Sequence, residues 1–522
     1  MAIQSSNVPQ IVTLDEWQGV NLQASRTSIE DQSCWWLENM FPVGPGQLRS
    51  AYGPSAPIYT APAGVTICRI FFADITTQNP SGFMCLSDGS VTRVDLNSHA
   101  TVNLGYIWAA APPNYWADIK LWTPNQFGAT GGQVGGIVLG SPQGMYAVDG
   151  NDLVSPPGTP APNWLTGGNS MIMPSGLPGI FAMEVYNQRL WVMGQTVVAF
   201  SAPTNGVDFS AAGGGGAFPY QGDQLTSSYT DLHATAGFLY VFGDSCAQAI
   251  NSINLVTQTT PIGVLYTTQF QFQNVDPQIG QRFFRPVGVW EQSFTLWNGS
   301  GIYLLTGGQM NWASERLTNL LATLDPAPFM PTQCPAHIFG KKWMLFNGTM
   351  TDVDKIKRSM LLCWSGPQLN QWVIASQNLN LTNIGCIEQN SVITPYGTDG
   401  TSLYQLFAQP DPNLEKRIQT KLYTGQFYLT QKDWKRTYVE WQDNMGGPEG
   451  VFLTGELITK LPQAKEGRLA VSYSLPPGGY DTSPSPEPGK GFSAALDLKG
   501  YSPDFTVARI SFTLEDRVLF GA

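Results

Sequence analysis

The chain offers few residues whose type and spacing would support catalysis or metal binding. Its three histidines are His99, His233 and His337, and none belongs to a set of Cys, His or acidic residues with the spacing of a metal site. The sequence also lacks a Walker loop, a Gly-x-Ser-x-Gly elbow and a His-Glu-x-x-His helix. We therefore predict no catalytic residue, no metal and no cofactor.

Two charged clusters could still have a function. Asp352 and Asp354 alternate as in a calcium loop but lack the glycine and the terminal glutamate of an EF-hand, so we interpret them as solvated turn carboxylates. The local concentration of basic residues in the first 410 positions indicates a solvated hairpin tip, with a docking or DNA-facing patch as the alternative. These basic residues are Lys341, Lys342, Lys355, Lys357 and Arg358.

The amino-acid composition indicates which secondary-structure elements position these residues. Of the 522 residues, 42% are hydrophobic, 12% are aromatic and only 12% are charged, about half the usual charged share. Together with 55 glycines and 38 prolines, this favours short strands joined by turns over long charged helices. A net charge of −11 argues against tight binding of nucleic acid, which needs Lys and Arg to neutralise phosphates.

Cysteines and hydropathy indicate where the chain folds. The seven cysteines are scattered without a Cys-x-x-Cys pair, which is typical of reduced thiols in a protein folded in the cytosol. The opening residues have neither the basic nor the apolar region of a signal peptide, and no stretch of 18 apolar residues occurs. We expect no membrane span.

One pattern recurs seven times: an apolar run, a turn with glycine and a second apolar run, as in a β-hairpin. The separation of the turn glycines is near 52 residues, about the length of one propeller blade with generous loops. The sequence thus predicts an all-β fold, a β-propeller-like ring of about six to eight blades; unrelated hairpins in a sandwich or a β-solenoid are the alternative. The turn glycines are Gly89, Gly144, Gly194, Gly243, Gly299, Gly348 and Gly400.

A propeller keeps carbohydrate chemistry open as an alternative function. Glycosidases on propellers draw their acid and base from different blades, and one sequence does not show which carboxylates converge. The sixteen tryptophans mostly lie in or beside apolar runs, so we interpret them as core packing between blades rather than as an exposed platform for sugars.

A change in charge divides the chain near residue 410. From Asp411 onward 27 of 112 residues are charged, against 38 of the 410 before it. Residues 506–514 alternate, with Ala508, Ile510, Phe512 and Leu514 on one face, as in a half-buried strand. We predict an N-terminal arm over 1–60, a propeller over 61–410 and a small C-terminal β-sandwich domain over 411–522.

The N-terminal segment carries a resemblance to a known family. Residues Glu38 to Arg49, read as Glu-Asn-Met-Phe-Pro-Val-Gly-Pro-Gly-Gln-Leu-Arg and followed by Gly53, resemble the opening signature of the tail nozzle family of short-tailed bacteriophages. That family includes tail tubular protein B and packaged DNA stabilisation proteins. The chain has Ser50-Ala-Tyr-Gly53 where the family often has a second arginine. The matching residues, which are also possible docking residues, are Asn39, Met40, Pro42, Gly46, Leu48, Arg49 and Gly53.

The resemblance implies a structural virion protein rather than an enzyme. It implies a ring of six copies below the portal and its adaptor in the short tail, assembled in the host cytoplasm, that retains the packaged genome and conducts DNA at ejection. Expected partners are further copies of the chain, the head-to-tail adaptor, tail fibre or spike proteins and, transiently, genomic double-stranded DNA. We expect residues 213–219 or 476–491, as long flexible loops, to form the tip or gate.

Overall fold

The computed structural model is built almost entirely of strands. It describes residues 10–516 apart from these gaps: 45, 75–79, 107–117, 123–135, 142–143, 149–169, 172–176, 178–179, 195, 207, 220–228, 236, 262, 277–278, 281–286, 299, 326–331, 425–431, 446–452, 461–467, 476–481 and 492. Its helices in these residues are single turns: η2 (Ala211–Gly213), η3 (Glu315–Leu317) and α1 (Thr318–Leu321).

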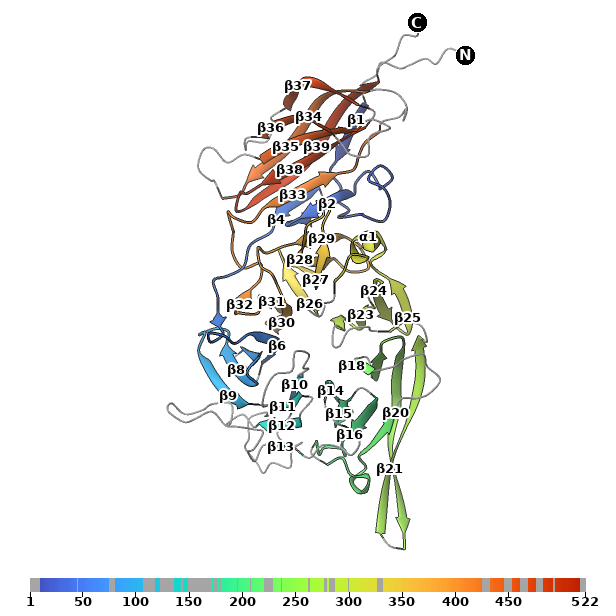
Figure 1. Cartoon of the computed structure of the whole chain (residues 1–522). Coiled ribbons are helices and arrows are strands. Elements are labelled where there is room, and N and C mark those ends of the chain that lie inside the picture. The colour runs from blue at the N-terminus through green and yellow to red at the C-terminus, as the bar shows by residue number, and fades with distance from the viewer. Residues whose placement is uncertain are drawn as a thin grey trace, which may run out of the picture.

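Seven four-stranded antiparallel blades are arranged around a ring in chain order (Figure 1). Blade one consists of β6 (Ile67–Asp74), β7 (Pro80–Leu86), β8 (Ser90–Asp95) and β9 (Thr101–Tyr106). Blade two consists of β10 (Asp118–Trp122), β11 (Gly136–Ser141), β12 (Gly144–Val148) and β13 (Ser170–Met171). Blade three consists of β14 (Ala182–Tyr186), β15 (Arg189–Met193), β16 (Val197–Phe200) and β17 (Gly216–Pro219). Blades four and five consist of β18 (Tyr229–Thr235), β19 (Phe238–Gly243), β20 (Ala247–Thr260) and β21 (Gly263–Asp276); and β22 (Gly288–Trp290), β23 (Ser293–Trp297), β24 (Ile302–Thr306) and β25 (Gln309–Trp312). Blades six and seven consist of β26 (Thr332–Ile338), β27 (Lys341–Thr351), β28 (Lys357–Trp364) and β29 (Trp372–Ala375); and β30 (Asn383–Gln389), β31 (Val392–Thr398), β32 (Ser402–Gln405) and β5 (Tyr59–Thr60).

The ring closes through the N-terminal part of the chain. Strand β5 pairs with β32 and completes the seventh blade, while the first strand of that blade, β30, packs against β6 of the first. Apolar side chains fill the spaces between blades, for example Phe242 of blade four with Phe294 of blade five. A ring buries both faces of every blade, which one sheet alone does not do.

The repeated sequence hairpin is the middle hairpin of each blade. The seven turns lie between the second and third strands, from β7–β8 to β31–β32, so the period near 52 residues is the blade period. Gly348 is the exception, because it lies inside β27 and the turn comes at Asp352 to Ile356. The prediction of an all-β propeller of six to eight blades followed by a sandwich is confirmed, with seven blades among the described residues.

The C-terminal domain is a sandwich of two sheets. The first sheet contains β1 (Gln10–Leu14), β3 (Met40–Gly44), β4 (Gln47–Ser50), β39 (Phe505–Asp516), β34 (Lys432–Asp443) and β37 (Thr482–Gly491). The second contains β2 (Cys34–Glu38), β33 (Lys416–Thr420), β38 (Ser493–Gly500), β35 (Leu453–Lys460) and β36 (Arg468–Leu475). Their inner faces share one core, in which the rings of Tyr423 and Phe512 lie 5.5 Å apart.

The N-terminal segment belongs to this sandwich. Strand β1 pairs with β39, β4 pairs with the other end of β39, and β2 pairs with β33. The structure therefore differs from the predicted arm over 1–60: most of its strands complete the domain that was placed at 411–522. The reason is that β2, β3 and β4 bury apolar residues such as Trp36 and Leu48, which an isolated arm would expose.

Blade six and the sandwich form one continuous nine-stranded sheet. Strand β2 lies between β29 of the blade, to which it is parallel, and β33 of the sandwich, to which it is antiparallel. The largest core cluster runs without a break from Trp343 and Trp372 in the blade to Trp36 and Trp441 in the sandwich. The two parts are thus joined by a shared sheet and core as well as by the chain.

Strand β39 buries a partly different set of side chains from the set that the alternation of its sequence predicts. Ile510, Phe512 and Leu514 are buried as predicted, but at the other end Val507 is buried and Ala508 is only half-buried. A bulge opposite Glu440 and Trp441 shifts the register by one residue, and such a shift exchanges the faces.

The two expected gate loops are in large part strands. Residues 213–219 include the end of η2 and strand β17, and Gly215 approaches Phe209 so closely that an added Cβ would lie 2.6 Å from its carbonyl carbon. Residues 482–491 form β37, where prolines are tolerated because the strand lies at a sheet edge; residues 476–481 lie outside the described residues. The expectation of flexible loops is wrong for these strand segments. Their glycines allow close packing, and their prolines lie in a strand at the edge of a sheet.

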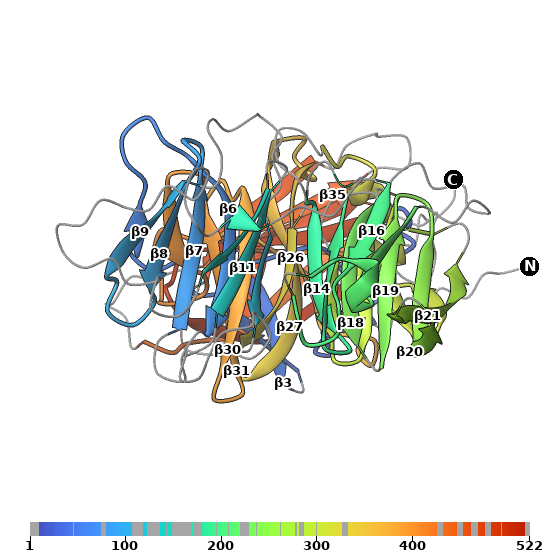
Figure 2. The same ribbon diagram turned by 90° about the horizontal axis from the view of Figure 1, so that it is seen from below.

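The long hairpin of β20 and β21 projects from blade four. Each strand has 14 residues, whereas the neighbouring β19 has six and pairs only as far as Ile250. Figure 1 shows the hairpin extending past the ring at the end farthest from the sandwich. Figure 2, from below, places β21 and the outer strand of blade one, β9, on opposite sides of the ring.

Candidate functional site

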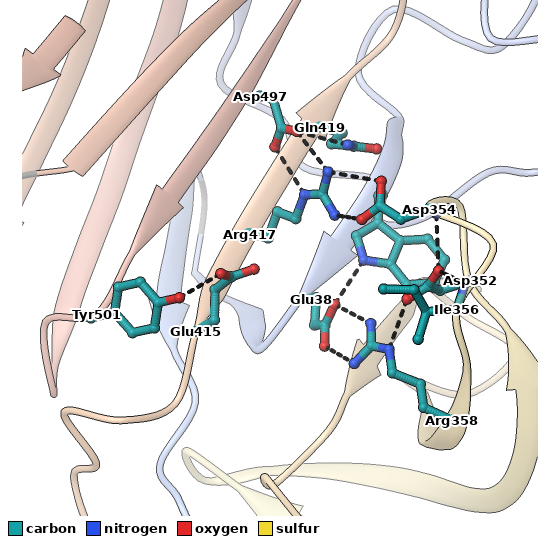
Figure 3. A network of polar contacts seen from close by, with 11 residues as sticks. Glu38, Asp352, Asp354, Ile356, Arg358, Glu415, Arg417, Gln419, Asp497 and Tyr501 are labelled. Atoms are coloured by element: carbon teal, nitrogen blue, oxygen red, sulfur yellow. Dashed lines mark hydrogen bonds and ion pairs between the residues drawn. The ribbon is translucent and has the colours of Figure 1, made fainter. Parts of the chain in front are cut away.

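A cavity of about 600 Å³ lies where blade six meets the sandwich. Strand β2 contributes Glu38, the β27–β28 turn contributes Asp352 and Asp354, and β33 contributes Arg417. Seven of the lining residues are charged: Glu38, Asp352, Asp354, Lys357, Arg358, Glu415 and Arg417. Two arginine centres organise them (Figure 3).

Arg358 forms the first centre. Its Nη1 and Nη2 donate to the two carboxylate oxygens of Glu38 at 2.6 and 2.7 Å, and its Nε donates to Asp352 at 2.9 Å. Trp36 Nε1 donates to Glu38 at 2.9 Å, and the other oxygen of Asp352 accepts from the backbone of Asp354 and Ile356. This bidentate pair ties a blade strand, β28, to a strand of the sandwich sheet, β2.

Arg417 forms the second centre. Its Nε and Nη2 donate to Asp497 on β38 at 3.0 and 2.7 Å, and its other side pairs with Asp354 of the blade turn. Gln419 donates to Asp497 at 2.8 Å. The side chains of Arg417 and Asp497 are 8% and 3% exposed, so this pair is buried. Arg417 therefore connects from the sandwich to the β27–β28 turn of the blade, whereas Arg358 connects from the blade to the sandwich.

The surroundings keep both arginines charged. Burial alone would lower the pKa of Arg358, but its hydrogen bonds to Glu38 and Asp352 outweigh burial and raise it. The same balance, with Asp497 and Asp354 as partners, raises the pKa of Arg417. In return the hydrogen bond from Arg417 lowers the pKa of the Asp354 carboxyl.

This arrangement clamps two parts of the chain and has little capacity for chemistry. Each arginine faces two carboxylates, so the acidic groups of the two centres are occupied by hydrogen bonds. Among the described residues, no group of three or more His, Cys, Asp and Glu side chains is arranged to hold a metal ion. Asp352 and Asp354 are indeed turn residues, but both are paired with arginine, and Asp352 is buried.

Asn39 of the predicted signature lies at the same junction. Its Nδ2 donates to Ser376 Oγ at 3.1 Å and to the Glu415 carbonyl at 2.7 Å, while its Oδ1 accepts from Ser376 N at 3.0 Å. Its backbone has φ of +55°, a left-handed conformation that asparagine tolerates better than most residues. Asn39 thus connects the residue after β29 with the residue before β33.

The other signature residues are also structural. Arg49 donates to both carboxylate oxygens of Asp504 at 3.1 and 2.7 Å and lies over the ring of Phe339. Gly53 exchanges backbone hydrogen bonds with Gln409 and Ala408, and an added Cβ would lie 2.5 Å from the Cβ of Asp411. Gly46 has φ of +70° in the β3–β4 turn. Met40, Pro42 and Leu48 are buried, so their side chains offer no surface for docking.

The histidines do not converge. His99 is exposed in a turn, and Nδ1 of His337 accepts from the backbone N–H of Ile393 at 2.9 Å. His233 lies 3.3 Å from Glu184, which also pairs with Lys120 at 3.1 Å. These three residues lie on the innermost strands of blades four, three and two. Burial would raise the pKa of Glu184, but Lys120 and His233 outweigh it and lower the pKa.

The basic cluster of the sequence is spread over intramolecular contacts. Lys341 donates to the carbonyl of Pro42, Lys342 lies over the ring of Trp290, and Lys357 pairs with Asp325. Arg358 belongs to the junction, and Lys355 takes a left-handed turn conformation. The cluster is therefore not one basic surface patch.

Sequence reasoning missed Arg417 and Asp497 and used Glu38 only as the first residue of a motif. Arg417 and Asp497 lie 80 residues apart in a charge-rich region, and no spacing rule links them. The sequence of β33, Lys-Arg-Ile-Gln-Thr, is that of a polar segment, and only the structure shows that the strand is buried along its length. Buried charges are normally paired, so acidic partners are expected once that burial is known.

The fold defines the class: a seven-bladed β-propeller that shares a sheet with a β-sandwich. No family model matches the chain, and no curated protein matches it. Among solved structures, BBS1N in its crystal structure with ARL6DN is 8% identical, with a TM-score of 0.40 over 69% of this chain and 98% of that one. Chaetomium thermophilum Raptor is 12% identical, with a TM-score of 0.38 over 68% of this chain and 30% of that one. In the described residues no helix is long and apolar enough to cross a membrane.

Proposed function

We propose that the chain is the structural nozzle protein of a short-tailed bacteriophage, without catalytic activity. Six copies would form a ring that extends the tail channel below the portal and adaptor, holds the packaged genome and conducts it at ejection. The proposal rests on the resemblance of residues 38–53 to the nozzle family, together with the propeller and sandwich layout that the resemblance implies.

The observation that carries the proposal is the place of the resembling residues. Asn39 exchanges hydrogen bonds with Ser376 after the last strand of blade six, and Arg49 lies over the ring of Phe339 in the same blade. Gly53 exchanges backbone hydrogen bonds with the residues that follow blade seven. The residues that carry the resemblance therefore lie at the joint between the propeller and the sandwich. A conduit under pressure from packaged DNA needs such a joint, because the two parts must move as one body.

Electrostatics support a conduit rather than a DNA-binding protein. The chain has a net charge of −11, and the two arginines of the junction cavity are each neutralised by two carboxylates. Tight DNA binding depends on Lys and Arg that release counterions from phosphates. A wall of net negative charge instead repels phosphates, so a duplex passes along it without sticking.

The test is immunogold electron microscopy of phage particles from the source, with antibody raised against the whole chain. The whole chain is the correct antigen because the sandwich needs strands from both ends of the sequence. We expect gold at the distal end of a short tail, with particles incubated with pre-immune serum as the control. Label on fibres or on the cell surface would refute the nozzle and favour the alternative of a glycan-binding or glycoside-cleaving propeller.

A further inference from the structure

The outer part of the β20–β21 hairpin is an uncharged surface held out from the molecule. No Lys, Arg, Asp or Glu occurs between Asp244 and Asp276. The ten residues Asn251–Thr260 lie beyond the last pair with β19, and at about 3.3 Å per residue they reach roughly 33 Å. Along its whole length β21 is the outer strand of its sheet in the described part of the chain.

One face of the hairpin carries exposed apolar side chains. Val264 and Tyr266 are two residues apart and therefore point to the same face, and they are 51% and 38% exposed. Their cross-strand partners are Thr259 and Thr257, and Leu255, 40% exposed, follows on the same face. This set, Leu255, Thr257, Thr259, Val264 and Tyr266, is called the hairpin face below.

The base of the hairpin is anchored, so the hairpin face is presented in a fixed direction. Arg189 donates to Thr268 at 3.0 Å, and Thr268 donates to the carbonyl of Gly214 at 2.6 Å. Gly214 lies directly against Leu255, where an added Cβ would come within 2.7 Å of its side chain. A surface that is already ordered loses little entropy when a partner binds.

An exposed hairpin of this kind is unfavourable in a protein that remains monomeric. Two strands with both faces in water are only marginally stable, and open strand edges without charge favour pairing with other chains. Proteins that remain monomeric usually guard such edges with lysine or proline, and from Val264 to Asp276 β21 contains neither. The hairpin therefore fits a partner that covers it.

The chemistry of the hairpin distinguishes among partners. Nucleic acid needs basic residues, of which the hairpin has none. Insertion into a lipid surface needs a continuous apolar side with basic flanks, whereas Thr257 and Thr259 interrupt the hairpin face. Threonines pair well with threonines across strands, and an uncharged surface lets two chains of net charge −11 meet without bringing carboxylates together.

We infer that the hairpin face binds a second copy of this chain. The contact is head-to-tail, because the hairpin is on one side of the ring of blades, and a copy that binds there leaves its own hairpin free for the next. The opposite side carries β9, an uncharged outer strand with exposed Tyr106, as a candidate receiving surface (Figure 2). The inference deepens the proposed function, since it names the subunit contact of the proposed ring.

The experiment places a photoreactive benzoylphenylalanine at position 264 of the full chain. The matched control is position 392, because Val392 is 53% exposed and also begins a strand of a hairpin. Irradiation of the isolated chain and of particles should give covalent dimers from position 264 in at least one of them and none from position 392. Cross-links from 264 to another protein or to lipid only, or none in either sample, would overturn the inference.

A charge variant provides the second measurement. Val264→Glu should weaken self-association, followed by sedimentation velocity, by about tenfold or more, because the variant buries an unpaired charge at the contact. Val264→Thr and Val392→Glu should leave association within about threefold of the original. Where the original chain self-associates, equal association of Val264→Glu would overturn the inference; where the isolated chain is monomeric, the cross-links in particles decide. Cross-linked dimers without gold at the tail would refute the nozzle and leave this contact standing, and the reverse result would do the opposite.

Discussion

Arg417 is predicted to stabilise the sandwich through Asp497 and its junction with blade six through Asp354. In Arg417→Met the Asp497 carboxylate, 3% exposed, keeps the hydrogen bond from Gln419 and its charge interaction with Arg26, while Asp354, 45% exposed, turns to water. Breaking one partner out of a buried pair costs about 3–5 kcal/mol. The remaining hydrogen bond to Asp497 offsets about 1 kcal/mol of this. We therefore expect a loss near the lower end of the range, about 3 kcal/mol in the free energy of unfolding.

Urea unfolding followed by tryptophan fluorescence measures this loss, since Trp36 and Trp441 lie in the shared core. The matched control is Arg509→Met, because Arg509 is 51% exposed and 4.0 Å from Glu440, a pair worth under about 1 kcal/mol. The double variant Arg417→Met, Asp497→Leu should recover part of the loss, because it removes the unpaired carboxylate but also the acidic neighbour of Arg26. A loss below about 1 kcal/mol for the single variant, or no recovery in the double, would refute the reasoning.

Three further predictions concern the junction. Asn39→Ala should lower the free energy of unfolding by about 2 kcal/mol or more, since it removes three hydrogen bonds. The control Asn378→Ala loses one exposed hydrogen bond and should cost under about 1 kcal/mol. Equal losses of the two variants in urea unfolding would contradict this prediction. Gly53→Ala should cost about 1–3 kcal/mol in the same assay because its Cβ would overlap Asp411, with Gly64→Ala, whose Cβ meets no atom within 4 Å, losing only about 1 kcal/mol to its positive φ. The carboxyls of Asp354 and Asp504 have lowered pKa values in the folded chain, Asp354 through Arg417 and Asp504 because Arg49 and Asn444 outweigh its burial. Their contribution is therefore present above about pH 4 and lost as the pH falls, and urea midpoints from pH 7 to pH 3 should decline only below about pH 4.

The propeller could be predicted from sequence because its signal is local and repeated. In five of the seven blades the middle hairpin spans 16 residues or fewer, so apolar alternation and turn glycines such as Gly89 and Gly400 mark it directly. Gly348 misled the position of one turn, because a glycine in a strand next to bulky neighbours, here Trp297 and Leu324, looks like a turn glycine in sequence.

The junction could not be predicted in the same way, because its partners are distant in the chain. Glu38 meets Arg358 across 320 residues, and Arg49 meets Asp504 across 455. Composition placed a boundary near residue 410, where charge rises, but the strands on either side of that boundary share one sheet. The density of charged residues indicates how a surface is solvated, whereas strand pairing determines which segments belong to one domain.

The closure of the ring by β5 has a consequence for how the chain is made. Strands β3 and β4 pair with each other, but the other pairings wait for partners that the ribosome supplies only after residue 372 for β2, residue 402 for β5 and residue 505 for β1 and the outer edge of β4. Until then β1, β2 and β5 are unpaired β segments, and such segments favour aggregation during synthesis. Blades one to five can form as they emerge, whereas blade seven and the sandwich wait for late synthesis. Expression as two separate halves should therefore fail, while a slow, cool synthesis of the intact chain should give the folded protein.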